Sequence, residues 1–319
     1  MSRLGGVDET SSVTGLAQAV ARAIRSAVLP FAGHRTAREV VGTAASGDAT
    51  FQIDRVAETA LQDYLQRTDV QVAYYSEDKG LVEVAPSPDW LLIVDPIDGT
   101  RPAAVGFEQA CVSVAVCPCL ETPRLRDVRA GCVIEIQSGR CFTAERGRGA
   151  RLDGRPCLVP TRATGADLGE VFWGFELVGR PAQHVIDVLG PLIDRSSVRA
   201  GVFVFNSSSY ALTRLTTGQL DAYLDVGGWI LAQRPESRAD FLAAGQGRVL
   251  GLFPYDIAAA VLIVQEAGGV VTDADGTDLG SVPVLDTTEQ NVLSCAASAT
   301  PAVHQALVAY VKDSVVGGR

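Results

Sequence analysis

The spacing of apolar residues predicts two amphipathic helices and then a series of short strands in the first half of the chain. Apolar side chains recur at helical spacing over residues 14–29, where Pro30 ends the pattern, and again over residues 54–65. Short apolar runs bounded by turn residues predict strands over 70–75, 90–94, 111–117, 131–136 and 140–144. This order of elements indicates an α+β arrangement for the first half.

The second half alternates between strand and helix patterns. The alternating segments are 170–175, 184–189, 202–205, 210–216, 222–225, 256–266, 270–273 and 301–312. Such alternation favours a layered α/β arrangement. Pro160 and a stretch of small polar residues interrupt the pattern near residue 160. We therefore predict an N-terminal α+β domain over 1–160 and a C-terminal α/β domain over 161–319.

Composition and charge narrow the class of protein. The chain has 319 residues, 47% of them hydrophobic, which is a globular composition. Its formal net charge of −10 argues against a nucleic-acid partner. Seven scattered cysteines indicate reduced thiols, and the Cys117/Cys119 pair lacks the second pair that a zinc site needs. No signal peptide or membrane-spanning run is evident, so we expect a cytoplasmic protein without a membrane partner.

One predicted strand ends in two carboxylates. The apolar run over 90–94 leads directly into Asp95 and Asp98, in the string Asp-Pro-Ile-Asp-Gly-Thr. A buried unpaired carboxylate is strongly unfavourable, and a hard cation such as Mg²⁺, which prefers oxygen ligands, would neutralise both. An ordinary Asp/Gly turn after a strand is the simpler alternative.

Other acidic residues stand at comparable positions. Glu77 follows a predicted strand, where a solvated turn is the ordinary interpretation. Asp48 and Asp54 are both compatible with helix capping. Asp256 opens a helix that is apolar nearly all round, which predicts that this helix and its carboxylate are buried.

Two separated motifs, in the order in which the inositol monophosphatase family carries them, give the chain a resemblance to that family. These are the string over 95–100, and the stretch from Tyr255-Asp256 to the Gly268-Gly269 pair. The family belongs to a Mg²⁺-dependent, lithium-sensitive phosphatase superfamily that includes fructose-1,6-bisphosphatases and adenosine-bisphosphate phosphatases. The resemblance implies an α/β fold built as a layered αβαβα sandwich, and we expect a homodimer.

The resemblance also implies a set of site residues. The expected metal ligands are Glu77, Asp95, Asp98, Asp256 and the main-chain oxygen of Ile97, around two or three Mg²⁺ ions. The expected catalytic residues are Thr100, which would orient the attacking water, Asp48, which would accept the Thr100 hydroxyl proton, and Glu77. The expected substrate contacts are Gly99 and Thr100 for the phosphate, Asn206, Ser207 and Ser208 on a polar loop, and Asp225 for sugar hydroxyls.

The chain departs from the family at several positions. Tyr255 stands where the family usually has tryptophan. After Thr100 the family commonly has a small polar residue, then asparagine and an aromatic residue, whereas this chain has Arg101-Pro102-Ala103 beside the expected substrate. A lysine before the Gly-Asp motif is missing, which weakens the case for a third metal ion. Residues 227–252 form an apparent insertion, whose arginines we expect to be solvated or intersubunit, with binding of a second phosphate as the alternative.

These observations predict a Mg²⁺-dependent phosphomonoesterase acting on a small phosphorylated polyol or sugar, with inositol monophosphate as the default. One alternative is a fructose-1,6-bisphosphatase or adenosine-3′,5′-bisphosphate phosphatase of the same superfamily. Another is a homologue that has lost catalysis and only binds a ligand.

Overall fold

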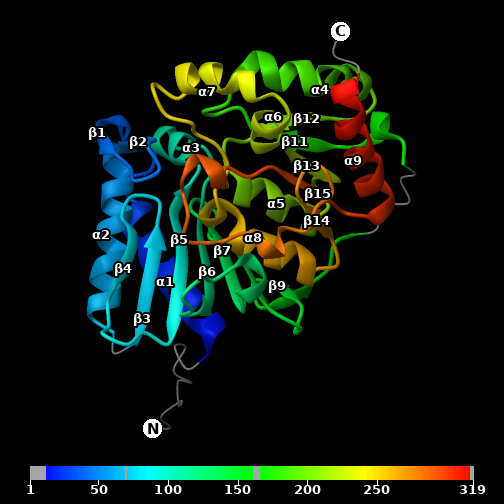
Figure 1. The fold of residues 1–319 in the computed structure, drawn as a ribbon. Coiled ribbons are helices and arrows are strands. Elements are labelled where there is room, and N and C mark those ends of the chain that lie inside the picture. Colours follow the sequence, from blue (N-terminus) through cyan, green and yellow to red (C-terminus); the bar gives the residue numbers. More distant parts are fainter. Residues whose placement is uncertain (1–11, 69, 161–165, 317–319) are drawn as a thin grey trace.

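Two β-sheets and three sets of helices alternate as five layers (Figure 1). The computed structural model describes residues 12–68, 70–160 and 166–316. The order of the layers is a helix pair, a large sheet, a central helix pair, a smaller sheet and an outer set of helices. The predicted αβαβα sandwich is confirmed.

The large sheet belongs to the first half of the chain and has the order β10-β9-β8-β7-β6-β5-β3-β4. Its strands are β3 (Val72–Ser76), β4 (Gly80–Glu83), β5 (Trp90–Asp98), β6 (Cys111–Pro118), β7 (Ala130–Glu135), β8 (Cys141–Glu145), β9 (Ala150–Leu152) and β10 (Arg155–Cys157). All neighbours are antiparallel except β3 and β5, which are parallel. Helices α1 (Val13–Val28) and α2 (Gln52–Gln66) cover its outer face, and a short hairpin of β1 (Val40–Thr43) and β2 (Ala49–Phe51) precedes α2.

The smaller sheet has the order β12-β11-β13-β15-β14. Its strands are β11 (Trp173–Phe175), β12 (Val202–Val204), β13 (Ala222–Asp225), β14 (Val270–Thr272) and β15 (Cys295–Ser298). Helices α5 (Ser208–Thr216) and α8 (Pro254–Glu266) lie between the sheets, while α4 (Ala182–Ser196) and α9 (Pro301–Val316) lie outside. The remaining helices are α3 (Thr100–Val105), α6 (Gly227–Gln233) and α7 (Arg238–Ala244).

Three hydrophobic cores fill the space between the five layers, and one of them surrounds the central helices on both sides. Each sheet contributes to two cores because successive side chains of a strand point to opposite faces of its sheet. On β5, Leu92 and Val94 pack toward α1 and α2, whereas Leu91 and Ile93 pack toward α8. A third core lies between the smaller sheet and α4 and α9. Gly131 of β7 lets α8 approach closely, since a methyl group there would lie 2.8 Å from the Ala259 carbonyl oxygen.

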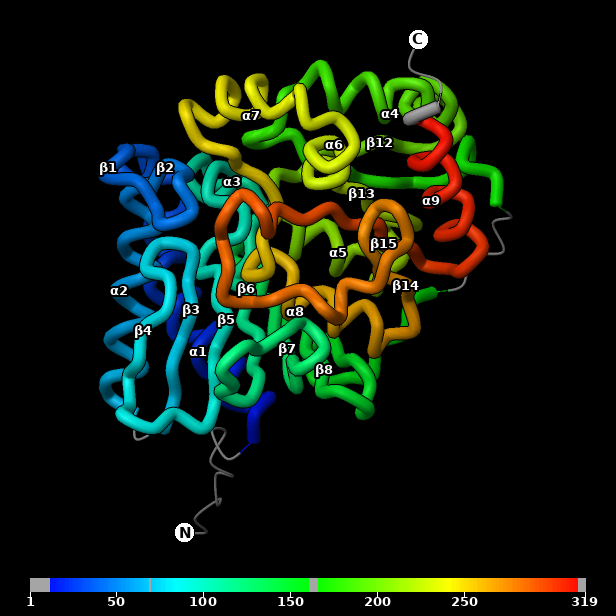
Figure 2. The backbone as a smooth tube through the Cα atoms, in the orientation of Figure 1, coloured from blue at the N-terminus to red at the C-terminus, as the bar shows by residue number. Residues whose placement is uncertain are grey.

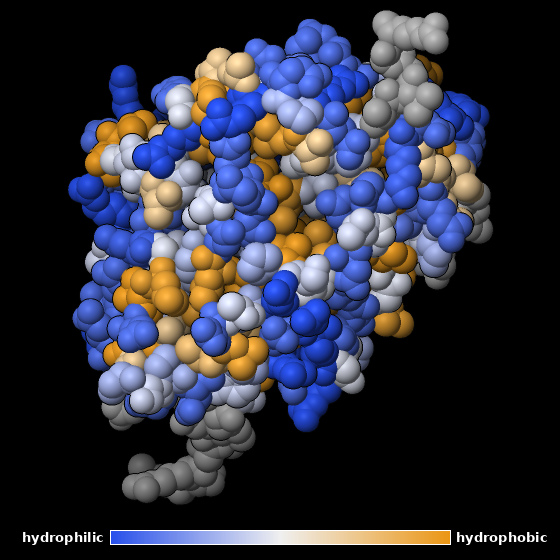
Figure 3. All heavy atoms as spheres, in the orientation of Figure 1, coloured by the Kyte–Doolittle hydropathy of each residue, from blue (hydrophilic) through white to orange (hydrophobic). Residues whose placement is uncertain are grey.

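The stretch after β14 ties the two halves together. In Figure 2 this orange segment passes beside the cyan strands of the large sheet. There the Tyr75 hydroxyl donates to Thr287 Oγ1 at 3.1 Å. Figure 3 shows apolar residues gathered over β3 and β4 on an otherwise mainly hydrophilic face, and Leu81 of β4 is half exposed.

Most predicted elements are present within a few residues. The elements that were not predicted are β1, β2, β4, β9, β10, β15, α3, α6 and α7. The boundary predicted near residue 160 stays a prediction, and it adjoins residues 161–165, which lie outside the described ranges. Helices α5 and α8 of the second half pack on the large sheet of the first. Among the described residues, no helix is long and apolar enough to cross a membrane.

Candidate active site

The end of β5 carries a bulge that sets the positions of two carboxylates. Asp95 pairs with Ser113 of β6 and Asp98 with Cys111, so three steps along β5 match two steps along β6. Such an extra residue bends a strand and re-aims its side chains. Gly99 follows with a φ of 90°, and a Cβ there would lie 2.6 Å from the Gln109 carbonyl oxygen. Only glycine fits this position without displacing backbone.

Almost all the predicted site residues line one pocket at this end of β5. Eleven of the twelve do so: Asp48, Glu77, Asp95, Ile97, Asp98, Gly99, Thr100, Asn206, Ser207, Ser208 and Asp256. They come from the β1–β2 loop, the end of β3, the end of β5, the start of α5 and the first turn of α8. Asp225 does not line the pocket. The fold therefore brings distant carboxylates together, and their roles as ligands stay a prediction.

Glu77 and Asp256 reach the pocket from different elements, because Glu77 follows β3 and Asp256 lies in the first turn of α8. The Ser46 hydroxyl donates to Glu77 Oε1 at 3.1 Å. Asp256 is the third residue of α8, and its Oδ2 accepts the Phe253 N–H at 2.7 Å. Asp256 therefore caps α8 from its third position, with Phe253 as the N-cap residue, and the same carboxylate also faces the pocket.

Burial and mutual repulsion raise the pKa values of the four carboxyls. Burial raises the pKa of Asp95 well above its usual range, with Asp98 and then Glu77 adding to the effect. Burial and then Asp256 do the same for Glu77. The pKa of Asp98 is raised to about 6 by burial, against hydrogen bonds from the backbone of α5. Such a cluster favours a bound cation, because a positive charge removes both the repulsion and the cost of burial.

The donor set fits a hard divalent metal ion in its chemistry. Carboxylate and carbonyl oxygens are the ligands that Mg²⁺ prefers. Within the described ranges, no three or more acidic, histidine or cysteine side chains are already grouped so as to hold a metal ion. Instead backbone N–H groups bind these carboxylates, as Ile97 N–H does Asp95 Oδ1 at 3.0 Å. The carboxylates share a pocket without forming a finished coordination shell.

Thr100 is hydrogen-bonded to Asp54. Its hydroxyl lies 2.8 Å from Asp54 Oδ1 and 3.1 Å from the Ile97 carbonyl oxygen. Asp54 is held by the Phe51 N–H at 2.8 Å, and burial raises its pKa to about 7. The prediction that Asp48 accepts the Thr100 proton is therefore wrong in this structure.

Asp48 is bound to Arg101 instead. The Arg101 guanidinium donates to both Asp48 oxygens, at 2.8 and 3.1 Å, in a bidentate pair. The central carbon of the Arg101 guanidinium lies 5.7 Å from the centre of the Phe51 ring. Both charged side chains line the pocket. The departure from the family at position 101 thus explains why Asp48 is not free to bind Thr100.

The loop that runs into α5 and the first turn of α5 support Asp98 as well as lining the pocket. The N–H groups of Ser208 and Ser209 donate to the two Asp98 carboxylate oxygens, at 3.2 and 2.5 Å. The Ser207 hydroxyl donates to the Asp98 carbonyl oxygen at 3.2 Å. Asn206 precedes them with a left-handed φ of 57°. The predicted substrate contacts of this loop remain a prediction.

Asp225 forms a buried ion pair with Arg180. Its carboxylate is fully buried, accepts two hydrogen bonds from Arg180 and also accepts the Gly227 N–H at 2.9 Å. Arg180 lines the pocket, and its stem passes 3.2 Å from where a Gly227 Cβ would be. Asp225 therefore does not line the pocket itself but holds Arg180, which does, and its predicted contact with sugar hydroxyls stays a prediction.

Sequence reasoning missed Arg180, Glu176 and the role of Asp54. Arg180 and Glu176 lie in the loop after β11, where a single charged residue gives no local signal. Burial raises the pKa of Glu176 to about 8, although Arg180 opposes this. Its Oε1 has no hydrogen-bond partner among the described residues. The capping position of Asp54 was the one signal available for that residue.

The apparent insertion over 227–252 is mainly helical, and its end reaches the pocket. Arg238 forms an exposed ion pair with Glu289. The side chain of Arg248 lies directly over Gly47, beside the Asp48 loop. Leu250 and Gly251 line the pocket itself. The expectation of solvated arginines thus fits Arg238, whereas Arg248 packs on the site's rim.

Comparison with known proteins identifies the same family that the motifs around the carboxylate pocket resemble. The sequence matches the family model described as "Inositol monophosphatase family" over residues 9–315. A fructose-1,6-bisphosphatase/inositol-1-monophosphatase of Methanothermobacter thermautotrophicus is 28% identical over 271 residues, covering 83% of this chain and 85% of that protein. A protein of Pseudomonas aeruginosa named Nus factor SuhB is 29% identical over 233 residues, covering 72% and 74%.

A solved structure shares the fold. The crystal structure of an inositol monophosphatase–fructose 1,6-bisphosphatase has a TM-score of 0.70 and 22% identity, covering 94% of this chain and 99% of that chain. The family match extends over nearly the whole length, and the carboxylates of both family motifs meet in one pocket. The chain therefore belongs to the inositol monophosphatase family and is a phosphoric monoester hydrolase.

Proposed function

We propose that the chain is a Mg²⁺-dependent phosphomonoesterase that hydrolyses a small phosphorylated polyol or sugar, with inositol monophosphate as the default substrate. The observation that carries this proposal is the set of four buried carboxyls that line one pocket with raised pKa values. Oxygen ligands from separate segments are what a two-metal site requires, because one short segment cannot surround two ions. Homodimerisation, a cytoplasmic location and the number of ions, two or three, stay predictions.

Glu77, Asp95, Asp98, Asp256 and the Ile97 carbonyl oxygen would hold the ions. When bound, two divalent ions supply an activated water and neutralise the leaving oxygen of the ester. Thr100 can give its proton to Asp54, which leaves the lone pairs of the Thr100 oxygen to accept a hydrogen bond from water. Threonine and aspartate together would thus orient the attacking water.

The remaining pocket residues would bind and align the ester. Gly99 and Thr100 line the pocket, and their backbone N–H groups would donate to phosphate oxygens. Arg101 can neutralise phosphate charge near Asp48, because it sits at the pocket and is partly exposed. Burial of the carboxylates keeps bulk water away from the reacting phosphate.

A phosphate-release assay tests the proposal directly. We expect Mg²⁺-dependent release from inositol 1-phosphate, its loss with EDTA, and its recovery when Mg²⁺ is restored. Asp95→Asn should lower turnover at least a hundredfold while leaving the fold intact, on the scale of losing one charged group that acts in the transition state. Asp89→Asn, at the exposed start of the same strand, is the matched control and should retain activity.

One observation favours a second candidate, a sugar bisphosphatase or nucleoside-bisphosphate phosphatase. The carboxylate predicted to hold sugar hydroxyls instead holds Arg180, and a guanidinium is a good ligand for a second phosphate. Fructose 1,6-bisphosphate and adenosine 3′,5′-bisphosphate therefore belong in the same assay. If Arg180→Gln lowers kcat/KM for a bisphosphate about tenfold more than for inositol 1-phosphate, this candidate is favoured.

A ligand-binding homologue without catalysis is the outcome if no ester releases phosphate in Mg²⁺. Calorimetric titration with Mg²⁺ would then establish whether the pocket still binds metal. Catalysis by the wild-type protein on any of the esters would exclude this alternative.

A further inference from the structure

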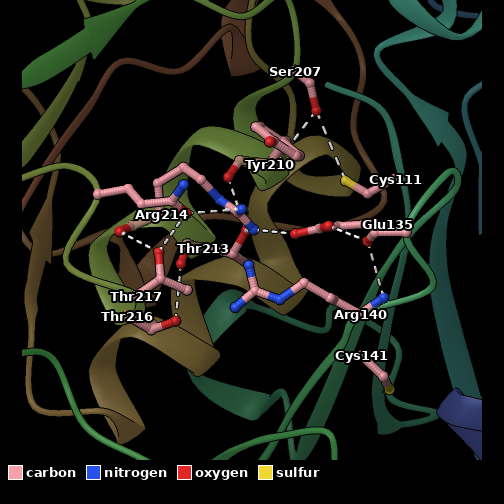
Figure 4. Close-up of polar contacts among 12 residues, drawn as sticks. Cys111, Glu135, Arg140, Cys141, Ser207, Tyr210, Thr213, Arg214, Thr216 and Thr217 are labelled. Carbon is pink, nitrogen blue, oxygen red and sulfur yellow. Dashed lines mark hydrogen bonds and ion pairs between the residues drawn. The ribbon is translucent and has the colours of Figure 1, made fainter. Parts of the chain in front are cut away.

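Two cysteines lie in contact on the face of the large sheet away from the active site. Cys132 of β7 and Cys141 of β8 have their sulfur atoms 3.8 Å apart. They are diagonal neighbours across the strand pair, because Cys132 is opposite Thr143 and Cys141 is opposite Ile134. Both belong to the core that faces α1 and α2. In Figure 4 the Cys141 side chain lies apart from the hydrogen-bonded group around Arg214 and points away from it.

One of the two thiols can be reached from solvent. Cys141 is 8% exposed, whereas Cys132 is fully buried. Cys141 lines a groove of about 570 Å³ between α1 and the turn after β7. Other side chains lining this groove are Gln18, Arg22, Arg25 and Asp153. A small oxidant can therefore meet Cys141 first.

The surroundings of Cys141 stabilise a thiolate. Its sulfur is 3.8 Å from the Cys132 thiol and accepts a hydrogen bond from Gln18 Nε2 at 3.6 Å. The hydrogen bond from Cys132 lowers the pKa of Cys141 to about 7 against the effect of burial, and Gln18 and Arg22 lower it further, while Asp153 opposes them. Burial raises the pKa of Cys132 well above its usual range. The two thiols thus differ in pKa, with Cys141 suited to attack an oxidant and Cys132 suited to resolve the product.

We propose that Cys132 and Cys141 form a site of reversible oxidation by hydroperoxides, closing to an intramolecular disulfide. The Cys141 thiolate attacks the terminal peroxide oxygen, an S–O bond forms as the O–O bond breaks, and Cys141 becomes a sulfenic acid. The other peroxide oxygen leaves as hydroxide or alkoxide and takes a proton to give water or alcohol. The Cys132 sulfur then attacks the Cys141 sulfur, and hydroxide leaves with the Cys132 proton as water. The two thiols lose two electrons in all, and the peroxide gains them. The sulfur atoms must approach from 3.8 Å to about 2 Å.

The proposal is independent of phosphatase activity, so it is tested by thiol chemistry on the full-length protein. The protein is treated with a few equivalents of hydrogen peroxide, unfolded, alkylated with N-ethylmaleimide and analysed by intact mass and peptide mapping. We expect the number of alkylated thiols to fall by two from the seven in the chain, a linked peptide pair that contains Cys132 and Cys141, and full reversal by dithiothreitol.

Exposed Cys119 is the matched control for accessibility. Without peroxide, the alkylation rate of Cys141 should reach half its maximum near pH 7, where an ordinary thiol is only a few per cent ionised. Cys132→Ser should leave Cys141 as a sulfenic acid that a dimedone probe traps, with no disulfide formed.

Two results would overturn the proposal. In the first, peroxide modifies Cys119 while Cys132 and Cys141 both remain open to alkylation after unfolding. In the second, Cys141 proceeds to sulfinic acid in the wild-type protein without a linked peptide. Neither result depends on a variant that could fail to fold.

Discussion

Arg214 and Glu135 form a buried ion pair that joins the two halves of the molecule beneath the active site. Arg214 lies on α5 and Glu135 at the end of β7, and their side chains are 4% and 6% exposed. Figure 4 shows both side chains meeting between these elements. The Arg214 guanidinium also donates to Gln219 at 3.1 Å and lies 4.2 Å from the centre of the Tyr210 ring. We predict that Arg214→Met is strongly destabilising.

The expected loss is about 3–5 kcal/mol, the usual cost of removing one partner of a buried pair. Methionine keeps much of the volume, so the loss arises mainly from Glu135, whose carboxylate is left with the Ser138 hydroxyl as its side-chain partner. The lost contact with Tyr210 contributes about 1 kcal/mol within that range. Total stabilities of about 5–15 kcal/mol make such a loss easy to measure.

Urea unfolding of a double-mutant cycle tests the prediction. Arg214→Met and Glu135→Gln should each be destabilising, and the combined variant should be more stable than the sum of the two losses predicts, by at least about 1 kcal/mol. Additive losses, or a loss below about 1 kcal/mol for Arg214→Met, would refute the argument. The assay of phosphate release adds a readout, because the first turn of the same helix binds Asp98.

Three further predictions concern separate parts of the molecule. Asp54→Asn should lower phosphate release about tenfold or more, because it removes the charge of the group bound to Thr100, and a charged hydrogen bond contributes about 1.5–3 kcal/mol. Asp48→Asn should change the same rate about threefold or less, since its ion pair is partly exposed; equal effects would contradict the geometry. Gly131→Ala should lower the free energy of unfolding by about 1–3 kcal/mol, because the added methyl meets the backbone of α8, and an unchanged urea midpoint would exclude this contact. Burial lowers the pKa of His304, so below about pH 6.5 the unfolded chain binds more protons than the folded protein, and the free energy of unfolding should fall as pH drops. This fall should be shallower in His304→Gln, and identical curves of stability against pH for the two proteins would reject the assignment.

Local sequence was sufficient for the main elements and for part of the site. The run over 90–94 had to be a buried strand because it is short, apolar and branched, and it is the start of β5. The helix that opens with Asp256 was predicted as buried because it is apolar all round, and α8 lies between the two sheets. The carboxylates of Asp95 and Asp98 were therefore predicted from position and chemistry, whereas the resemblance to the family supplied the rest of the site.

Other assignments required the tertiary structure, because they depend on which side chains meet across distant segments. Asp48 and Asp54 look alike in sequence. The packing of the β1–β2 hairpin against α2 decides that Asp48 binds Arg101 and that Asp54 binds Thr100. Arg180 gives no local signal, yet it covers Asp225 and faces the pocket.

Hydrophobic periodicity, capping and motif spacing act over a few residues, so local sequence specifies most of the elements and the chemistry at their ends. Which side chains become partners depends on the fold. The bulge in β5 aims Asp95 and Asp98 into one pocket, and the register of β7 on β8 puts Cys132 against Cys141. Pairing of this kind depends on strand register and on layer packing, which are properties of the whole chain.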